Sequence, residues 1–98
     1  MRYSHQIIFE KIGEEGQKKL KKSSITILGL GGIGSRSAEL VARAGIGKLN
    51  LIDRDILEKS NLQRQTLYSE EDINKPKAFA IKEKLEKINS EIKISAKF

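Results

Sequence analysis

The stretch SITILGLGGIG, residues 24–34, decides the fold of this chain. An apolar run typical of a buried parallel strand leads into closely spaced glycines and then into a helical pattern. Glycine lacks Cβ, so the main chain there can adopt positive φ and approach a polyphosphate. Unpaired N–H groups at the start of the following helix then face the anion. The pattern predicts a nucleotide site at Gly29, Gly31, Gly32 and Gly34, and a tight strand-to-helix turn without a ligand is the alternative.

Composition bounds the class of protein. The 98 residues allow at most one small domain, and the absence of cysteine excludes disulfides, a thiol nucleophile and a Cys-ligated zinc site within this chain. No apolar run reaches the length of a membrane span or a signal peptide, so we expect a cytoplasmic protein without a membrane partner. The net charge of +6 includes a lysine-rich run at residues 18–22, which has no interleaved aromatic residues. This run favours a solvated helix end over a nucleic-acid surface.

Helical and strand patterns alternate along the chain. The expected elements are a helical segment over 4–22, broken near Gly13 and Gly16, a strand over 24–30, a helix over 32–44 capped by Gly45, a strand over 48–53, a loop over 54–72, a helix over 76–89 and a strand over 91–97. Such alternation predicts parallel β–α–β units with right-handed crossovers.

The fold class expected is therefore α/β. Residues 23–98 should form a Rossmann-like mononucleotide-binding half with three parallel strands in the order 3-2-1, and residues 1–22 should form a preceding helical segment of the same partial domain. A doubly wound sheet normally continues on the far side of its first strand. We therefore expect an incomplete sheet, as in a fragment, a split protein or a chain with an obligate partner.

Two acidic residues follow the second expected strand. Asp53 lies 19 residues beyond Gly34, at the carboxyl end of the strand, where a carboxylate can accept hydrogen bonds from ribose hydroxyls of either NAD or ATP. Asp55 can shape the ribose pocket or help to position a metal, and a solvated loop carboxylate is an equal alternative. No metal ligand is assigned on the sequence.

The segment SNLQRQ, residues 60–65, carries a second polar cluster. Asn61 and Arg64 are three positions apart, so one helical turn would place an amide and a guanidinium on the same side, where both suit polyphosphate oxygens. Lys77 stands at the start of a helix, where the dipole disfavours a cation. A nearby phosphate would relieve this, whereas an exposed lysine that points to water is the alternative.

These segments together resemble the ThiF/MoeB/HesA family, the bacterial and archaeal relatives of ubiquitin-activating enzymes. The resemblance covers essentially the whole chain and rests on RYSHQ at 2–6, GLGGIG at 29–34, DRD at 53–55, SNLQRQ at 60–65 and KPK at 75–77. The segment at 60–65 is not expected in a dehydrogenase, which makes the combination more specific than the glycine loop.

The resemblance implies an ATP-dependent adenylyltransferase that binds MgATP and activates the C-terminal carboxylate of a ubiquitin-like sulfur-carrier protein as an acyl-adenylate. Carried over by residue, Gly31 and Gly32 would line the nucleotide loop and Asp53 would hold the ribose. Asn61 and Arg64 would contact phosphates, with Ser60 and Gln63 beside them. Lys77 would neutralise the triphosphate, which makes Arg64 and Lys77 the expected catalytic residues.

The chain departs from the family in two respects. His5 stands where the family usually has an arginine that reaches the ATP of a homodimer partner. The family's downstream magnesium-binding aspartate, its frequent Cys-x-x-Cys zinc site and its carrier-binding surface are not in this sequence, so we expect the Mg²⁺ ligand outside the chain. A homodimer or a complementary subunit is the expected assembly. An NAD- or FAD-binding Rossmann half and a non-catalytic relative that acts through a partner subunit are the alternatives.

Overall fold

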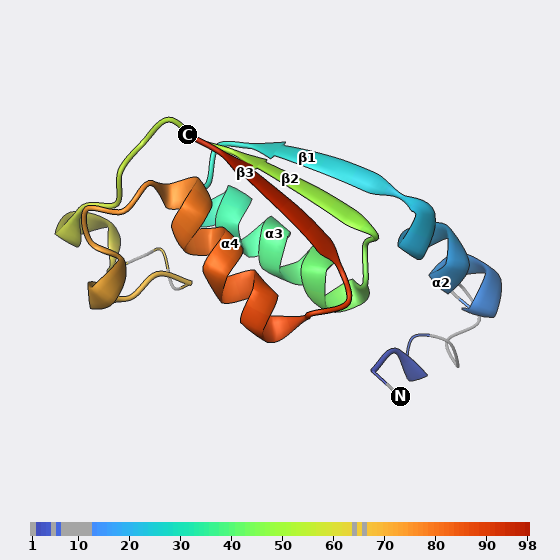
Figure 1. The fold of residues 1–98 in the computed structure, drawn as a ribbon. Coiled ribbons are helices and arrows are strands. Elements are labelled where there is room, and N and C mark those ends of the chain that lie inside the picture. Colours follow the sequence, from blue (N-terminus) through green and yellow to red (C-terminus); the bar gives the residue numbers. More distant parts are fainter. Residues whose placement is uncertain (1, 5, 7–12, 64, 66) are drawn as a thin grey trace.

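Three parallel strands and two covering helices form the body of the protein (Figure 1). The structure is a computed structural model that describes residues 2–4, 6, 13–63, 65 and 67–98. The elements, in chain order, are α2 (Gly13–Lys22), β1 (Ser24–Leu28), α3 (Gly32–Ala44), β2 (Lys48–Ile52), the short 3₁₀ helices η1 (Lys59–Asn61) and η2 (Glu70–Asp72), α4 (Lys77–Ile88) and β3 (Lys93–Lys97). The expected α/β class is confirmed. No helix of the described residues is long and apolar enough to cross a membrane.

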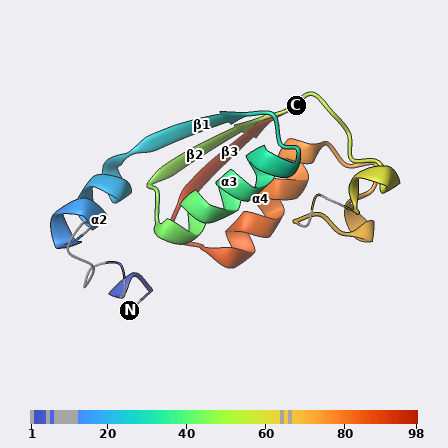
Figure 2. The ribbon, with the colours of Figure 1, turned by 180° about the vertical axis from the view of Figure 1, so that it is seen from behind.

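The sheet has the order β1-β2-β3 with all strands parallel, which confirms the predicted order 3-2-1. Its register aligns Ile25 with Leu49 and Leu49 with Ile94. Figures 1 and 2 show α3 and α4 side by side on the same face of the sheet. The core lies between these layers and includes the fully buried side chains of Leu30, Ile46, Leu49, Leu51, Leu57, Ile81 and Leu85.

The opposite face of the sheet is polar at its centre. The Asn50 side chain donates to the hydroxyls of Ser24 and Thr26 at 3.4 and 3.3 Å, and it accepts a bond of 2.6 Å from the Ser95 hydroxyl. The strands of a parallel sheet that is covered on both faces are apolar along their whole length. In β1, β2 and β3, by contrast, more buried and less buried residues alternate. Within the described residues this face carries no helix, and β1 pairs with a neighbour on one side.

Element boundaries differ from the expected ones for local reasons. The first strand ends at Leu28 because Gly29 takes a φ of 88° and turns the chain out of the sheet. Gly45, with a φ of 94°, caps α3 as expected. The expected break near Gly16 is wrong, since α2 runs without interruption from Gly13. The remainder of the break region, residues 7–12, lies outside the described residues.

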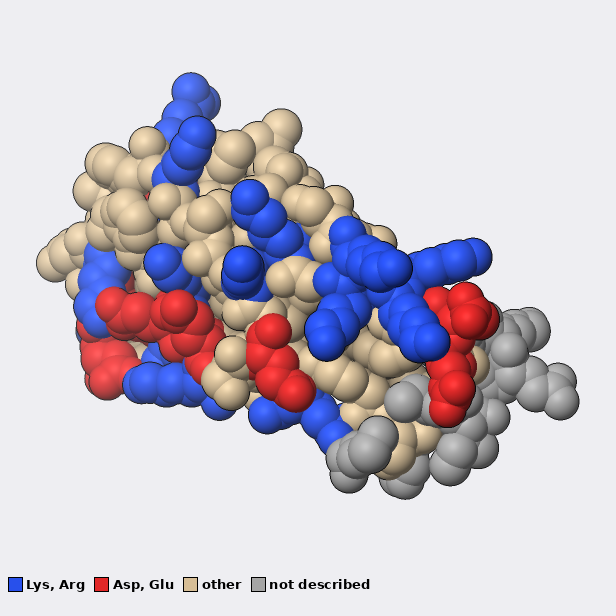
Figure 3. Space-filling view, turned by 45° about the vertical axis from the view of Figure 1, so that its right-hand side comes forward, with Lys and Arg blue, Asp and Glu red and all other residues tan. Residues whose placement is uncertain are grey.

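The lysines of the run at 18–22 are exposed, and α2 places them at its C-terminal end with glutamates in its first turn. Basic side chains gather at this end of the molecule (Figure 3). Cations near a helix C-terminus interact favourably with the dipole, so this arrangement has a structural explanation without a ligand.

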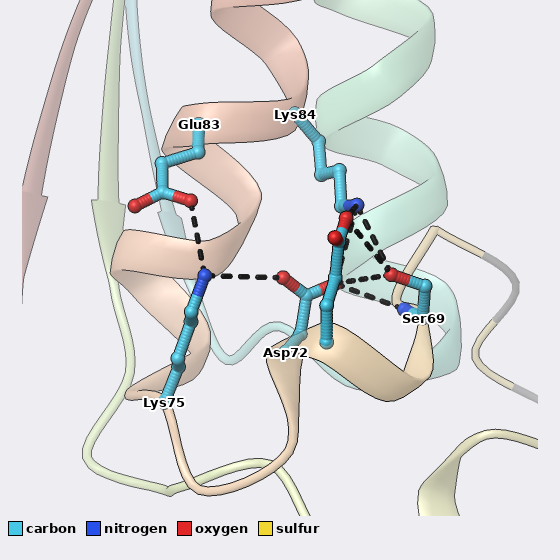
Figure 4. A network of polar contacts seen from close by, with 6 residues as sticks. Ser69, Asp72, Lys75, Glu83 and Lys84 are labelled. Atoms are coloured by element: carbon cyan, nitrogen blue, oxygen red, sulfur yellow. Dashed lines mark hydrogen bonds and ion pairs between the residues drawn. The ribbon is translucent and has the colours of Figure 1, made fainter.

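The loop over 54–72 is held against α4 by a small network of charges (Figure 4). The carboxylate of Asp72 is buried and accepts hydrogen bonds from the N–H and the hydroxyl of Ser69 at 2.9 and 3.1 Å. The Lys84 ammonium lies 3.4 Å from the same carboxylate, and Lys75 bridges Asp72 at 3.8 Å and Glu83 at 3.3 Å. Buried carboxylates need such partners, and here they fix the end of the loop on the helix.

We expect Gly34→Ala to lower the free energy of unfolding by about 1–3 kcal/mol. A Cβ at Gly34 would collide with the carbonyl oxygen of Gly29, so helix and loop would have to separate. Alanine is otherwise the better helix former, which means that any loss reports the collision. Urea denaturation measures the change. Gly31→Ala is the matched control, because its φ is −75° and an added Cβ meets nothing within 4 Å. Equal stability of the Gly34→Ala and Gly31→Ala chains would contradict this packing.

Candidate functional site

The start of α3 presents unpaired main-chain donors. No hydrogen bond among the described residues uses the N–H groups of residues 31–34, which the first turn of a helix cannot satisfy internally. The first turn of α3 also carries no acidic side chain, and the N-cap Gly31 makes no side-chain capping bond. Open space lies where a Cβ of Gly31 would stand. The arrangement suits an anion, because both the free donors and the helix dipole favour negative charge.

Asp53 connects the ends of β1 and β2. Its Oδ2 accepts the N–H of Leu30 at 2.6 Å and its Oδ1 accepts the N–H of Asp55 at 2.7 Å, while the residue is only 7% exposed. Each carboxylate oxygen has a second lone pair, so the group can still accept a hydroxyl hydrogen bond from a ligand. Asp53 therefore stands at the carboxyl edge of the sheet, as expected, and fixes the main chain there.

Tyr68 holds the same loop from the other side. Its hydroxyl donates a hydrogen bond of 2.7 Å to the carbonyl oxygen of Leu30, and the residue is buried in the core cluster. Burial raises the pKa of the Tyr68 phenol well above its ordinary value of 10, and the carboxylates of Asp53 and Asp72 add to the rise. The hydroxyl therefore stays protonated and acts as a donor.

Lys77 and Asp55 are brought to this edge by the pairing of the loop with the start of α4. Ile56 bridges to Pro76, and the N–H of Lys77 donates to the carbonyl oxygen of Asp55 at 3.0 Å. Lys77 is the first residue of α4 and is 6% exposed, and its ammonium forms no ion pair with any described residue. The side chain of Asp55 is exposed. A buried lysine without a carboxylate partner at a helix N-terminus is a position that a bound anion would stabilise.

The segment at 60–65 is placed only in part. The side chain of Asn61 closes the η1 turn, where its Oδ1 accepts the N–H of Glu58 at 2.9 Å. Its amide nitrogen takes no part in closing this turn. Ser60 and Gln63 are exposed. Arg64 lies outside the described residues, as does His5. The expected alignment of Asn61 with Arg64 therefore stays a prediction.

Gln65 is a candidate site residue that sequence reasoning missed. It is 4% exposed, and its side-chain oxygen has no hydrogen-bond partner among the described residues. Buried polar atoms are normally paired, so this oxygen is a candidate acceptor for a ligand donor.

Tyr68 was missed by sequence reasoning as well. Its only signal was a lone aromatic residue in the loop over 54–72, which is too common to single out.

A cleft of about 690 Å³ lies at the opposite end of the sheet, lined mainly by residues of α2, the turn after α3 and the turn before β3. It contains none of the nucleotide-site residues predicted on the sequence. The glycine loop is the better candidate, because free amides and a buried lysine are specific signals for an anion, whereas the shape of a cleft is not. His, Cys, Asp and Glu side chains nowhere converge in threes among the described residues to form a metal site.

Comparison with known proteins identifies the family. The sequence pattern of the ThiF family matches residues 3–98. The chain belongs to the ThiF family. The sulfur carrier protein ThiS adenylyltransferase of Bacillus subtilis (strain 168) is 49% identical to it over 96 residues, which are 96% of this chain and 29% of that protein. The molybdopterin-synthase adenylyltransferase of Haemophilus influenzae is 45% identical over 94 residues, which are 96% of this chain and 39% of that protein.

Solved structures of ThiF-like proteins share the fold. The crystal structure of E. coli MccB with ATP superposes with a TM-score of 0.89 and 43% identity, and it covers 97% of this chain and 29% of that chain. E. coli tRNA N6-threonylcarbamoyladenosine dehydratase, TcdA, gives a TM-score of 0.88 at 31% identity over 96% of this chain and 38% of that chain. This ThiF-family chain thus spans roughly a third of the length of the relatives it matches.

In this ThiF-family chain, we expect the Tyr68 phenol to keep its proton at pH values where an ordinary tyrosine ionises. The folded-state pKa is raised above the unfolded value, so the stability that this proton contributes is full below about pH 10 and is lost as the pH rises further. A titration of tyrosinate absorbance tests this on a chain with two tyrosines. One phenol should ionise only when the chain unfolds, and Tyr68→Phe should remove that late step. Loss of an early step in Tyr68→Phe would contradict the burial.

Proposed function

We propose that this chain is the ATP-binding part of an adenylyltransferase of the ubiquitin-activating type. The observation that carries the proposal is the set of free amides at residues 31–34, at the same edge of the sheet as the buried carboxylate of Asp53 and the largely buried, unpaired side chain of Lys77. Free donors, a helix dipole and an unpaired cation together select a polyanion. A carboxylate at the end of the neighbouring strand adds an acceptor for ribose hydroxyls.

Each residue has a distinct part in holding MgATP. The amides of Gly31 and Gly32 bind phosphate oxygens, and Asp53 accepts hydrogen bonds from the ribose. Lys77 neutralises charge on the triphosphate. Asn61 and Arg64 contact phosphates from the segment that also contains Ser60 and Gln63, and Gly29, Gly34 and Asp55 shape the loop around the nucleotide. Mg²⁺ supplies further charge neutralisation when it is bound, and its ligand belongs to polypeptide outside this chain.

The reaction proposed is activation of the C-terminal carboxylate of a ubiquitin-like sulfur-carrier protein. A carboxylate oxygen attacks the α-phosphorus of ATP and forms a new P–O bond. The bond from the α-phosphorus to its bridging oxygen breaks, and pyrophosphate leaves with that oxygen and its electron pair. The product is an acyl-adenylate. No proton transfer is needed, so the protein contributes position and positive charge, which Lys77 and Arg64 supply.

The family supports this assignment. Relatives that match nearly the whole chain are sulfur carrier protein adenylyltransferases, and MccB was crystallised with ATP and with AMPCPP. The chain covers 29% of the B. subtilis relative, so the carrier-binding surface is proposed to lie outside these residues. The free edge of β1 and the uncovered sheet face are the places where a complementary subunit or the rest of a longer chain would pack.

We expect Lys77→Met to weaken MgATP binding about 10- to 100-fold, the range for a lost charge-assisted hydrogen bond. Methionine keeps most of the buried stem of the lysine, so the fold is retained and the loss reports the charge. Isothermal titration calorimetry with MgATP measures the dissociation constant. Lys87→Met is the matched control, because Lys87 is an exposed lysine near the other end of the same helix.

Titration with NAD separates this function from that of a dinucleotide-binding half-domain. The proposal predicts binding of ATP and none of NAD. Binding of NAD that is indifferent to Lys77→Met would assign the chain to the dinucleotide class instead. ATP binding without pyrophosphate exchange in the presence of a sulfur carrier would leave ATP binding standing and point to a non-catalytic relative.

A further inference from the structure

Hydrogen bonds from one main-chain group and two side chains hold the start of the glycine loop. The N–H of Gly29 donates to the carbonyl oxygen of Ile52 at 2.9 Å, and the N–H of Leu30 donates to Asp53 at 2.6 Å. The carbonyl oxygen of Leu30 accepts the hydroxyl of Tyr68 at 2.7 Å. After this point, the next N–H groups along the chain, at residues 31–34, have no partner among the described residues. Tyr68 thus makes the last contact before the free amides.

The bond to Tyr68 sets the direction of the first free amide. The carbonyl group of Leu30 and the N–H of Gly31 belong to the same peptide unit, which is planar and trans, so the two groups point in opposite directions. With the carbonyl oxygen held toward the buried phenol, the N–H of Gly31 is directed away from it. An added Cβ at Gly31 meets nothing within 4 Å, so the main chain there adjoins open space.

The peptide between Leu30 and Gly31 needs a hydrogen bond to hold its orientation, because Gly31 is a glycine. Without a Cβ, Gly31 rotates freely about φ, so the peptide between Leu30 and Gly31 can flip with little steric resistance. Leu30 is itself fixed, because its side chain is fully buried and its N–H is bonded to Asp53. The orientation of the Leu30 carbonyl group is the one that can still change. In the flipped peptide, the carbonyl oxygen would face an incoming phosphate and repel it.

We propose that Tyr68 is a positioning residue for nucleotide binding, which locks the peptide between Leu30 and Gly31 with its N–H toward the phosphate. This role rests on the proposed ATP site. Tyr68 acts through the main chain and makes no contact with the ligand. It is suited to the task because it is 6% exposed and packs in the core cluster, which keeps the phenol from following a movement of the loop.

The test compares Tyr68→Phe with the wild-type chain by ¹⁵N NMR without ligand and by calorimetry with MgATP. We expect exchange broadening or loss of the Gly31 and Gly32 amide signals in the variant, together with an ATP dissociation constant raised about tenfold. Tyr3→Phe is the matched control. Its hydroxyl also takes part in one hydrogen bond, accepting the side-chain amide of Asn89 at 2.7 Å, but it lies at the opposite end of the sheet. Tyr3→Phe should leave both readouts unchanged.

The two readouts distinguish the failure of each proposal. Unchanged Gly31 and Gly32 signals in Tyr68→Phe would overturn the positioning role, as would equal effects of Tyr3→Phe. A wild-type chain that binds no ATP would overturn the proposed function, and the ligand-free spectra would still decide the role of Tyr68 in the loop. If Tyr68→Phe does not fold, the unaltered chain gives the answer. The hydroxyl proton of Tyr68 should then exchange slowly with water because it is buried and bonded to the carbonyl oxygen of Leu30, and fast exchange of this proton would overturn the role.

Discussion

The hydrogen bonds from two main-chain N–H groups to the buried carboxylate of Asp53 are the interaction on which the rest of this structure depends. They bind the turn after β1 to the turn after β2 and leave both oxygens engaged at 2.6 and 2.7 Å. A buried carboxylate is costly without such donors, so the sequence can place an acid here only if both turns fold around it. Once they do, the glycine loop has a fixed origin, and α3 starts in a defined direction.

A charge imbalance follows from this arrangement. The start of α3 has unpaired donors and no acid in its first turn, and α4 begins with a buried lysine. Both helices direct the positive ends of their dipoles to the same edge of the sheet, as the right-handed β–α–β crossover requires. Within the described residues no carboxylate pairs with Lys77. An anion bound at this edge would therefore stabilise the folded chain.

The strand order, the helix ends and the position of Asp53 could be predicted from the sequence because each depends on short stretches of chain. The turn at Gly29 needs positive φ, α3 ends where Gly45 adopts the left-handed conformation, and Asp53 follows directly on an apolar strand. Each of these signals lies within a few residues of the element it defines. The parallel order then follows from the alternation of strands and helices.

The contacts that complete the site could not be predicted in the same way. Tyr68 reaches Leu30 across 38 positions of sequence, and Asp72 meets Lys84 only after the loop has folded onto α4. The loop over 54–72 has no periodic pattern, so no local sequence signal shows which of its side chains are buried.

The continuity of α2 through Gly16 was also not predicted, because it too depends on packing. Gly16 lowers helix propensity by about 1 kcal/mol, which the packing of Gln17 and Leu20 offsets.

The central claim is that the anion site lies at the glycine loop. Mapping of amide chemical shifts in the ¹⁵N-labelled chain during titration with MgATP tests it most directly. The account predicts that the largest changes occur at Leu30–Gly34, with accompanying changes at Asp53 and Lys77. Changes concentrated instead at the cleft between α2 and the turn before β3, or an unchanged spectrum at saturating MgATP, would contradict it.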